Sequence, residues 1–393
     1  RDLDVYKKAK TLTIRDSIVS SLRTNVPFVD SVRKAARMIE VGMVALDPHN
    51  GHIKAMVGGR NFRVFRYGLN HVTQIHRQPG SAFKPFIYTV AIDNGWPVCY
   101  EIQNQPVTVQ MPDGTRWTPQ NFEGNFGGKY TLREALKRSI NLVAVRLMLE
   151  LEVGTVVDYA HRMGIKSKVP PYASIALGTA EVSPLELTSA YGVFPNEGVL
   201  VEPIAILRIE DKDGNVIEEN VPERREVLSK ETAYLMTNLM EGGVNEEGGT
   251  GVAIRKFFSL PAAGKTGTTN DYGDAWFEGF TPHLAAGIWV GFDDNRIKFG
   301  SADGQGARAA APIFGRFMRD TYEDPDIGLQ VDYFRQPDGI MTDTICVLTK
   351  KRARPFCPED TTEIFNARYP IGQCDVHTSV HWKEEKNANK INW

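Results

Sequence analysis

The chain has 393 residues, of which 42% are hydrophobic and 24% charged, and its formal net charge is −2. A length of about 150 residues per domain predicts two or three domains. The small net charge and the lack of a long run of like charge argue against a general nucleic-acid binder. No stretch approaches the roughly 18 consecutive apolar residues of a membrane-spanning helix. The chain starts at Arg1 without a visible signal peptide, so we expect a fragment or a processed form.

The first expected elements are a charged, helix-prone segment over residues 1–40 and a β-hairpin. We interpret residues 1–40 as a linker or the end of a preceding domain. Residues 42–47 and 53–57 are apolar and flank Asn50-Gly51. Both of these turn residues tolerate the positive φ of a type I′ turn, which predicts the hairpin.

Residues 77–200 are expected to be mostly helical. Pro79-Gly80 precedes an apolar helix over residues 81–92. Thr131-Leu-Arg-Glu134 and Ser183-Pro-Leu-Glu186 have the pattern of capping boxes, which mark helix starts.

Strands are expected again near the end of the chain. Residues 206–210 and 215–218 flank Asp213-Gly214, residues 275–280 and 284–292 form a further hairpin, and residues 309–322 form a closing helix. The rest, from about residue 323, is predicted to be loop-rich. Strands, many helices and strands again predict an α/β or α+β layered fold with an antiparallel sheet.

The first motif that carries chemistry is Ser81-Ala-Phe-Lys84. Positions i and i+3 of a helix share a face, so the motif places a hydroxyl beside an amine that can take its proton. Ser81 would lie in the first helical turn, where free N–H groups can stabilise an oxyanion. We expect Gly80 to let a substrate backbone approach closely. The spacing alone carries little weight, because Ser31-Val-Arg-Lys34 shares it and is more simply a solvated helix face.

Two further motifs follow in order. Ser139-Ile-Asn141 can project a hydroxyl and a carboxamide together from a turn between helices, although a helix cap explains it equally well alone. In Lys265-Thr-Gly-Thr268, a strand would point Lys265 and Gly267 to one side and both threonines to the other. We expect Gly267 to leave room for a ligand backbone. A surface edge strand is the simpler explanation of this motif by itself.

Taken together in this order, the motifs resemble the serine β-lactamases and penicillin-binding proteins. Their flanks resemble the transpeptidase domain of bifunctional class A penicillin-binding proteins. The quoted similarity runs through Asp47-Pro-His-Asn-Gly51, Met56-Val-Gly-Gly59, Arg77-Gln-Pro-Gly-Ser-Ala-Phe-Lys-Pro85, Thr131-Leu-Arg-Glu-Ala-Leu-Lys-Arg-Ser-Ile-Asn141, Ala263-Gly-Lys-Thr-Gly-Thr-Thr-Asn270 and Asp274-Ala-Trp-Phe-Glu-Gly-Phe-Thr-Pro282.

The resemblance implies a five-stranded antiparallel sheet flanked by helices, with an all-helical subdomain. It implies a linker over residues 1–40, a transpeptidase domain over residues 41–322 and a Cys-containing extension over residues 323–393. A membrane anchor and a glycosyltransferase domain, both absent here, would precede the fragment. The expected location is the periplasm, at the extracytoplasmic face of the inner membrane.

The resemblance also implies a role for each motif residue. Ser81 would attack the D-Ala-D-Ala carbonyl of a peptidoglycan stem peptide and would also be acylated by β-lactam antibiotics. Lys84 would be its base, kept neutral by burial and by the neighbouring Lys265. Ser139 would relay a proton to the leaving amine. The substrate-binding residues would be Asn141, Thr266, Gly267 and Thr268, with Lys265 and the two threonines holding the terminal carboxylate and the Thr268 N–H serving as an oxyanion donor.

No cofactor and no metal are expected for this reaction. Expected partners are stem peptides, β-lactams and possible cell-wall synthesis proteins, with no nucleic acid. A DD-carboxypeptidase, a β-lactam sensor and a β-lactamase remain alternatives, and a β-lactamase would need Glu181 or Glu186 to activate water. His71, His76, His161 and His283 show no metal-binding spacing and are interpreted as structural.

Three of the four cysteines, Cys346, Cys357 and Cys374, lie near the C-terminus. In an oxidising compartment such crowding favours a disulfide. We expect a Cys357–Cys374 bond, with Cys346 as a rival partner, while Cys374-Asp-Val-His377 keeps a zinc site as the alternative. Cys99 is expected to be a packed thiol.

Overall fold

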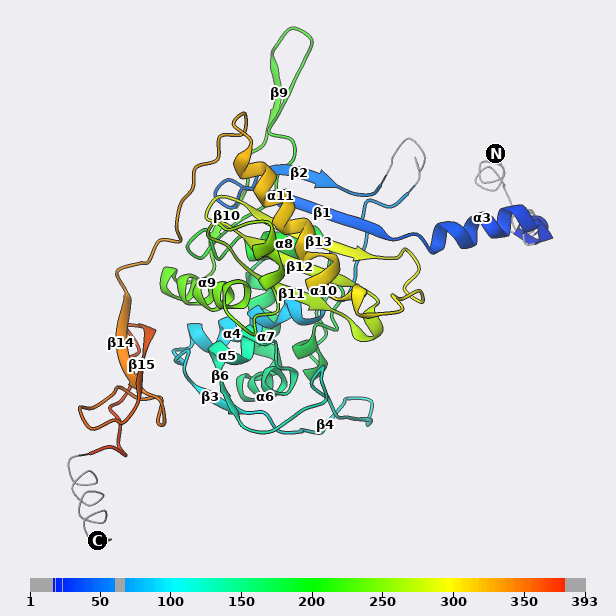
Figure 1. The fold of residues 1–393 in the computed structure, drawn as a ribbon. Coiled ribbons are helices and arrows are strands. Elements are labelled where there is room, and N and C mark those ends of the chain that lie inside the picture. The colour runs from blue at the N-terminus through cyan, green and yellow to red at the C-terminus, as the bar shows by residue number, and fades with distance from the viewer. Residues whose placement is uncertain (1–16, 18, 23, 61–67, 379–393) are drawn as a thin grey trace.

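A computed structural model describes residues 17, 19–22, 24–60 and 68–378. Its centre is a five-stranded antiparallel sheet with the strand order β11-β12-β13-β1-β2 (Figure 1). These strands are β1 (Glu40–Leu46), β2 (Ile53–Val57), β11 (Ala263–Thr268), β12 (Ala275–Phe280) and β13 (Ala285–Gly291). Early and late strands therefore share one sheet, and the predicted layered α/β class is confirmed.

Both faces of the central strands β12 and β13 are buried, because successive side chains enter different apolar clusters. On β12, Trp276 belongs to the larger cluster, which includes the helices around α4. Its neighbour Phe277 belongs to a second cluster and packs against Phe314 of α11, with tilted rings whose centroids are 4.8 Å apart. The period-2 alternation of a strand thus joins the sheet to a helical layer on each side.

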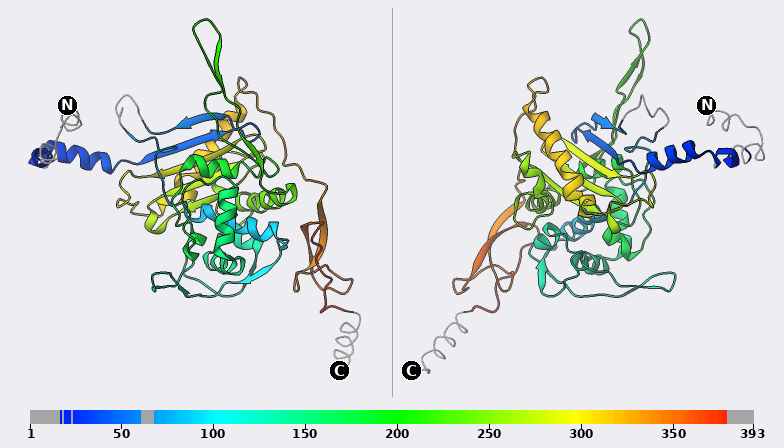
Figure 2. Two further views of the ribbon diagram at one scale, coloured as in Figure 1. Left: turned by 180° about the vertical axis from the view of Figure 1, so that it is seen from behind. Right: turned by 45° about the vertical axis from the view of Figure 1, so that its right-hand side comes forward.

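Except for α3 (Val26–Ala36), which projects away from the sheet in Figure 1, the helices form these two layers. The α-helices are α3 (Val26–Ala36), α4 (Lys84–Asp93), α5 (Leu132–Lys137), α6 (Asn141–Leu151), α7 (Val153–Arg162), α8 (Pro184–Tyr191), α9 (Lys230–Asn245), α10 (Gly306–Ala309) and α11 (Ala311–Glu323). The 3-10 turns are η1 (Gly80–Phe83), η2 (Ala173–Leu177), η3 (Val252–Lys256), η4 (Asn270–Tyr272) and η5 (Ala302–Gly304). Figure 2 shows α11 crossing one face of the sheet, with the α4–α7 group gathered on the other side.

Short two-stranded ribbons complete the main body, which we define as residues 40–323. They pair β3 (Glu101–Gln103) with β6 (Lys129–Thr131), β4 (Val109–Gln110) with β5 (Arg116–Trp117), β7 (Val199–Val201) with β10 (Arg224–Glu226), and β8 (Arg208–Glu210) with β9 (Val216–Glu219). The β8–β9 hairpin projects away from the body (Figure 1). All three predicted hairpins are present, in β1–β2, β8–β9 and β12–β13.

Two local expectations were wrong. The turn at Asn50-Gly51 is not type I′, because Gly51 has a positive φ (73°) and Asn50 does not. The Asn50 amide instead donates to the Asp47 carboxylate at 2.7 Å, which holds a wider turn closed. The apolar helix expected over residues 81–92 is divided, since it starts as the 3-10 turn η1 and becomes α-helical only at Lys84.

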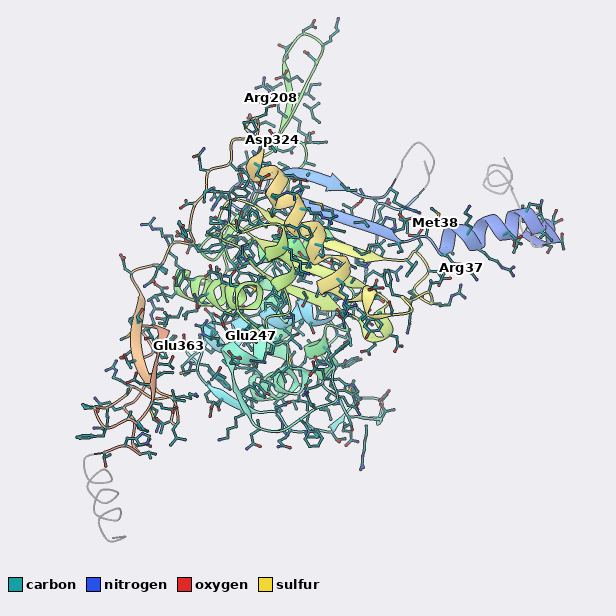
Figure 3. The ribbon with its side chains drawn as sticks, in the orientation of Figure 1. Arg37, Met38, Arg208, Glu247, Asp324 and Glu363 are labelled. Carbon is teal, nitrogen blue, oxygen red and sulfur yellow. The ribbon has the colours of Figure 1, made fainter. Side chains whose placement is uncertain are left out.

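The chain after α11 was expected to be loop-rich, but it contains a further hairpin, β14 (Ile340–Cys346) paired with β15 (Asp360–Asn366). We call residues 340–378 the extension. It lies beside the main body (Figure 1), and Glu363, labelled in Figure 3, joins the two. The carboxylate of Glu363 accepts two hydrogen bonds from Arg133 of α5, at 2.8 and 2.6 Å.

The expected Cys357–Cys374 disulfide is not formed, because all four cysteines are free thiols. Three of them converge with a histidine in the extension, which a single disulfide does not account for. Cys99 is buried, as expected, and its thiol donates to the Lys350 carbonyl of the extension at 3.3 Å. Over the described residues, no helix has the length and apolar character needed to cross a membrane.

Candidate active site

Ser81 lies in the 3-10 turn that leads into α4, at the junction of the helical layer and the edge strand β11. Its carbonyl accepts the backbone N–H of Lys84, and Lys84 opens α4 as a fully buried residue. Among the residues described, no partner takes the Ser81 N–H or the Ser81 hydroxyl. The sequence therefore gives a half-buried hydroxyl together with one free backbone donor, its own N–H group, as a first helical turn allows.

Glycines allow the Ser81 turn and β11 to touch, but not for the expected reason. A Cβ on Gly80 would lie 2.5 Å from the Thr268 carbonyl oxygen, and one on Gly267 would lie 2.2 Å from the Pro79 oxygen. The close approach at both glycines is therefore made by the protein's own backbone, not by a ligand. Gly80 also has a positive φ of 57°, which a glycine adopts without strain.

The Ser139-Ile-Asn141 motif occupies the turn between α5 and α6. Ser139 has a φ of 58°, in the left-handed region that a non-glycine residue rarely adopts. Such strain persists only where surrounding contacts hold it, and it is common at functional sites. Asn141 begins α6, and its amide donates to the Gln120 carbonyl at 2.9 Å, which fixes the direction of its oxygen.

Lys84 is the centre of the cluster. Its amine donates to the Ser139 carbonyl at 2.6 Å and to Asn141 Oδ1 at 2.7 Å. The Ser139 hydroxyl lies 3.2 Å from the same nitrogen. The SxxK lysine and the SxN pair, which are more than 50 residues apart in sequence, are thus joined directly.

Lys265 reaches the same serine from β11. Its amine donates to Ser139 Oγ at 2.9 Å, so the Ser139 hydroxyl lies between two buried lysines. Burial, and then the charge of Lys265, lower the pKa of Lys84 well below its usual value. Burial also lowers the pKa of Lys265, to about 7. Two amines so close in a desolvated site favour the neutral form of at least one of them.

The two threonines of the third motif lie on one side of β11, as the period of a strand predicts, but their hydroxyls have different partners. Thr266 Oγ1 donates to Thr250 Oγ1 at 2.7 Å, whereas Thr268 Oγ1 accepts the N–H of Gly306 at 3.0 Å. The backbone of Thr268 lies against the Ser81 turn, at Gly80. Because the Thr268 hydroxyl only accepts a bond from Gly306, its own proton is available for donation. Thr250, which also lies 3.5 Å from the Lys265 amine, was missed by the sequence reasoning. Its only signal is a glycine-rich loop, which is a weak one.

Other supporting contacts were also missed. Asn121 Oδ1 accepts the backbone N–H groups of Asn141 and Leu142, each at 3.0 Å, and so caps α6. The Tyr191 hydroxyl donates to the Ala82 carbonyl at 2.6 Å and steadies the Ser81 turn. No short sequence motif identifies these residues, because they are distant in sequence from the groups that they contact and reach them only in the folded chain.

The glutamates considered as water activators are placed differently. Glu186 completes the predicted capping box with Ser183, and its carboxylate also accepts the N–H groups of Lys166 and Ser167. Glu181 is exposed, and within the described chain no hydrogen bond joins it to Ser81. His71, taken as structural, bonds Gly58 and Asp293 and stacks on Trp289.

Known penicillin-binding proteins are similar to this chain in sequence. Penicillin-binding protein 1A of Neisseria lactamica is 35% identical over 316 residues, covering 77% of this chain and 38% of that protein. Penicillin-binding protein 1A of Aquifex aeolicus is 39% identical over 283 residues, covering 72% of this chain and 38% of that protein. The chain therefore spans 38% of the length of these relatives.

Solved structures of penicillin-binding proteins are also similar to this chain in fold. The crystal structure of penicillin-binding protein 1A from Haemophilus influenzae has a TM-score of 0.76 at 28% identity, covering 85% of this chain and 54% of that one. PonA1 of Mycobacterium tuberculosis in complex with penicillin V has a TM-score of 0.65 at 27% identity, covering 79% of this chain and 85% of that one. Residues 41–319 match the penicillin binding protein transpeptidase domain, and the chain belongs to this family of serine acyltransferases.

Proposed function

We propose that this chain is a D,D-transpeptidase, which forms an acyl-enzyme at Ser81 with the D-Ala-D-Ala end of a peptidoglycan stem peptide and passes the acyl group to an amine. The observation that carries the proposal is the Lys84–Ser139–Lys265 cluster beside Ser81, in which burial lowers the pKa of both lysines. A serine needs such a neutral base to become a nucleophile at physiological pH.

In the acylation step, Ser81 Oγ attacks the carbonyl carbon of the penultimate D-Ala while its proton passes to the neutral Lys84 amine. Two N–H groups of Lys84 are already directed to the Ser139 carbonyl and Asn141 Oδ1. In the neutral amine, these two bonds would leave the lone pair of Lys84 available to accept the proton of Ser81. The developing oxyanion would be stabilised by the backbone N–H groups of Ser81 and Thr268. The contact between Gly80 and Thr268 supports this pairing, because it holds the two backbones together.

In the second half of the step, the peptide C–N bond breaks and the leaving D-Ala amine needs a proton. Ser139 Oγ lies 3.2 Å from Lys84 and 2.9 Å from Lys265, so it can give its proton to the leaving amine and take one from Lys84. The acceptor amine of a second stem peptide would then attack the ester carbonyl, lose its proton by the reverse path and free Ser81.

The terminal carboxylate of the substrate would bind beside Lys265, Thr266 and Thr268. Of these three residues, Lys265 can carry a positive charge, and a bound carboxylate would favour its charged form. The edge position of β11 supports this placement, because the outer side of the strand has no partner in the sheet. An extended peptide can pair with such an edge through main-chain hydrogen bonds.

β-Lactams would acylate Ser81 by the same route and inhibit the enzyme. We also propose that the chain works at the extracytoplasmic face of the inner membrane, where its substrate lies. Residues 1–40 would be a linker, 41–322 the catalytic domain and 323–393 a Cys-containing C-terminal segment that includes the extension defined above. Other cell-wall synthesis proteins are candidate partners.

A β-lactamase is disfavoured by Glu186, whose carboxylate is occupied by backbone N–H groups. We therefore expect slow deacylation. Nitrocefin turnover faster than about one per minute, a barrier near 20 kcal/mol, would instead support a β-lactamase.

The direct test supplies a synthetic stem peptide ending in D-Ala-D-Ala with an amine acceptor, and measures D-Ala release and both products by mass spectrometry. The transpeptidase proposal expects an amide-linked product that is absent with Ser81→Ala. Hydrolysed peptide alone would indicate a DD-carboxypeptidase. Penicillin adducts without any peptide turnover would indicate a sensor.

A further inference from the structure

The extension gathers three cysteines and one histidine far from the Ser81 cluster in sequence. Cys346 ends β14, Cys357 lies in the loop between the two strands, and Cys374 and His377 follow β15. One ligand atom from each of the four lies within 4.8 Å of every other. Cys346 and Cys374 are buried, while Cys357 and His377 are half-buried.

The distances inside this cluster suit a tetrahedral metal site. His377 Nδ1 lies 3.3 Å from Cys346 Sγ and 3.5 Å from Cys374 Sγ. Zinc bonds of about 2.3 Å to sulfur and about 2.0 Å to nitrogen place neighbouring tetrahedral ligands roughly 3.5–3.8 Å apart. The histidine nitrogen is thus near two different sulfurs at once, which a single disulfide does not require.

The backbone around the ligands is arranged to orient them. The Arg354 N–H donates to Cys357 Sγ at 3.2 Å, and the His377 N–H donates to Cys374 Sγ at 3.5 Å. The Cys374 N–H donates to the Arg352 carbonyl at 2.8 Å, which joins the last ligand segment to the inner loop. Hydrogen bonds of this kind orient metal ligands.

The extension also needs a constraint besides apolar packing. The cluster of buried apolar residues at its hairpin is Cys99, Ile345 and Phe365, and Cys99 belongs to the main body. A unit of about 40 residues or fewer rarely folds on such a core without a disulfide, a metal or a partner. Four convergent ligands would supply that constraint.

We propose that Cys346, Cys357, Cys374 and His377 form a structural zinc site that holds the extension together. Three thiols lose their protons as Zn²⁺ binds three thiolates and the neutral imidazole through Nδ1, so no oxidant is needed. All four tetrahedral positions are filled by the protein, which leaves none for substrate or water. The site is therefore independent of the proposed transpeptidase reaction. It replaces the disulfide that the sequence favoured.

The test uses the full chain, purified under reducing conditions, stripped of metal and mixed with zinc. Elemental analysis after gel filtration should give one zinc per chain. His377→Ala, at a half-exposed ligand near the end of the described chain, should weaken zinc binding by more than the roughly 100-fold that loss of a supporting contact costs. Cys99→Ala removes a cysteine outside the cluster and should bind zinc like the wild type.

Cobalt gives a second measurement that needs no variant. Co²⁺ bound to the wild type should show the intense visible bands of a tetrahedral cobalt–thiolate site, and zinc should abolish them. Wild type that binds no zinc, or zinc binding that His377→Ala leaves unchanged, would overturn the proposal. So would non-reducing peptide maps of the protein, isolated from its own compartment, that link two of the three cysteines.

Discussion

The main body and the extension are stabilised in different ways. The main body buries both faces of the central strands of its sheet, and its apolar clusters run through nearly every helix. The extension has one hairpin and a very small apolar cluster, but it gathers three thiols and an imidazole. A large core can hold a strained, desolvated site such as Ser139 between two lysines. A small one must rely on covalent or metal bonds.

The two regions also use their buried reactive side chains differently. Burial in the main body lowers lysine pKa values, which supports catalysis, at a cost that the core must offset. In the extension, reactive side chains face one another and serve stability. The following predictions would break or sharpen this comparison.

The largest effect is expected for Lys84→Ala. Loss of the base should slow acylation by penicillin by about 10²–10⁴-fold, the range for removing general base catalysis. Stopped-flow or gel-based labelling with a fluorescent penicillin measures the rate, and circular dichroism checks the fold. Lys34→Ala, at an exposed position on α3 in the second SxxK sequence, is the matched control and should change nothing. Equal losses in both variants would refute the role of Lys84.

The next effect concerns pH. The lysine base must be neutral, so acylation should be fastest above the pKa of Lys84 and fall about tenfold per pH unit below it. The charge of Lys265 helps to lower that pKa. Lys265→Met should therefore raise the pKa of Lys84 and move the acid limb of the rate profile to higher pH. For each variant, the acylation rates at low pH are divided by that variant's own maximal rate at high pH. This is needed because weaker substrate binding would lower the rate at every pH.

The control for the pH profile is Lys137→Met. Lys137 is also a buried lysine, but its ammonium group is paired with Glu134 and Glu246. In Lys137→Met, the acylation rate should fall at the same pH as in the wild type. A limb that stays in place with Lys265→Met would show that Lys265 does not tune the base.

A smaller effect is expected at the junction of the two regions. The Arg133–Glu363 pair is bidentate and its side chains are only 18% and 11% exposed. Glu363→Gln should cost about 1.5–3 kcal/mol of docking free energy, the range for a hydrogen bond to a charged group. Hydrogen exchange of β14–β15 should become faster, whereas the exposed Glu359→Gln should leave it unchanged. Equal exchange in both variants would mean that this pair does not dock the extension.

The smallest effect on catalysis is expected from metal removal. Stripping zinc from the reduced protein should speed hydrogen exchange over residues 340–378, yet change penicillin acylation less than about twofold, because distant sites act nearly independently. If acylation collapses with the extension, the main body is not the self-sufficient unit described above.

Much of the fold could be predicted because local signals agree with it. The three hairpins follow from turn residues and period-2 patterns, whereas the sharing of one sheet by early and late strands was expected from the order of the elements and the family resemblance. The 3-10 start at Ser81 could not, since it depends on Gly80 packing against Thr268 and Gly178, far away in sequence. The β14–β15 hairpin was missed because charged and threonine residues hide its alternation.

The candidate site shows the same division. Residues that act through fixed spacing, such as Ser81 with Lys84 and Ser139 with Asn141, could be identified from the sequence. Thr250 could not, because its hydroxyl reaches the site only through the tertiary fold. The cysteines were found but paired wrongly, since spacing says nothing about which sulfurs meet a histidine.

The central claim is that Ser81 is the nucleophile, and one measurement tests it most directly. Intact-mass spectrometry after benzylpenicillin, followed by peptide mapping, should show a single adduct on the peptide that carries Ser81, and none with Ser81→Ala. An adduct on Ser139 or Ser31, or labelling that persists in Ser81→Ala, would contradict the account.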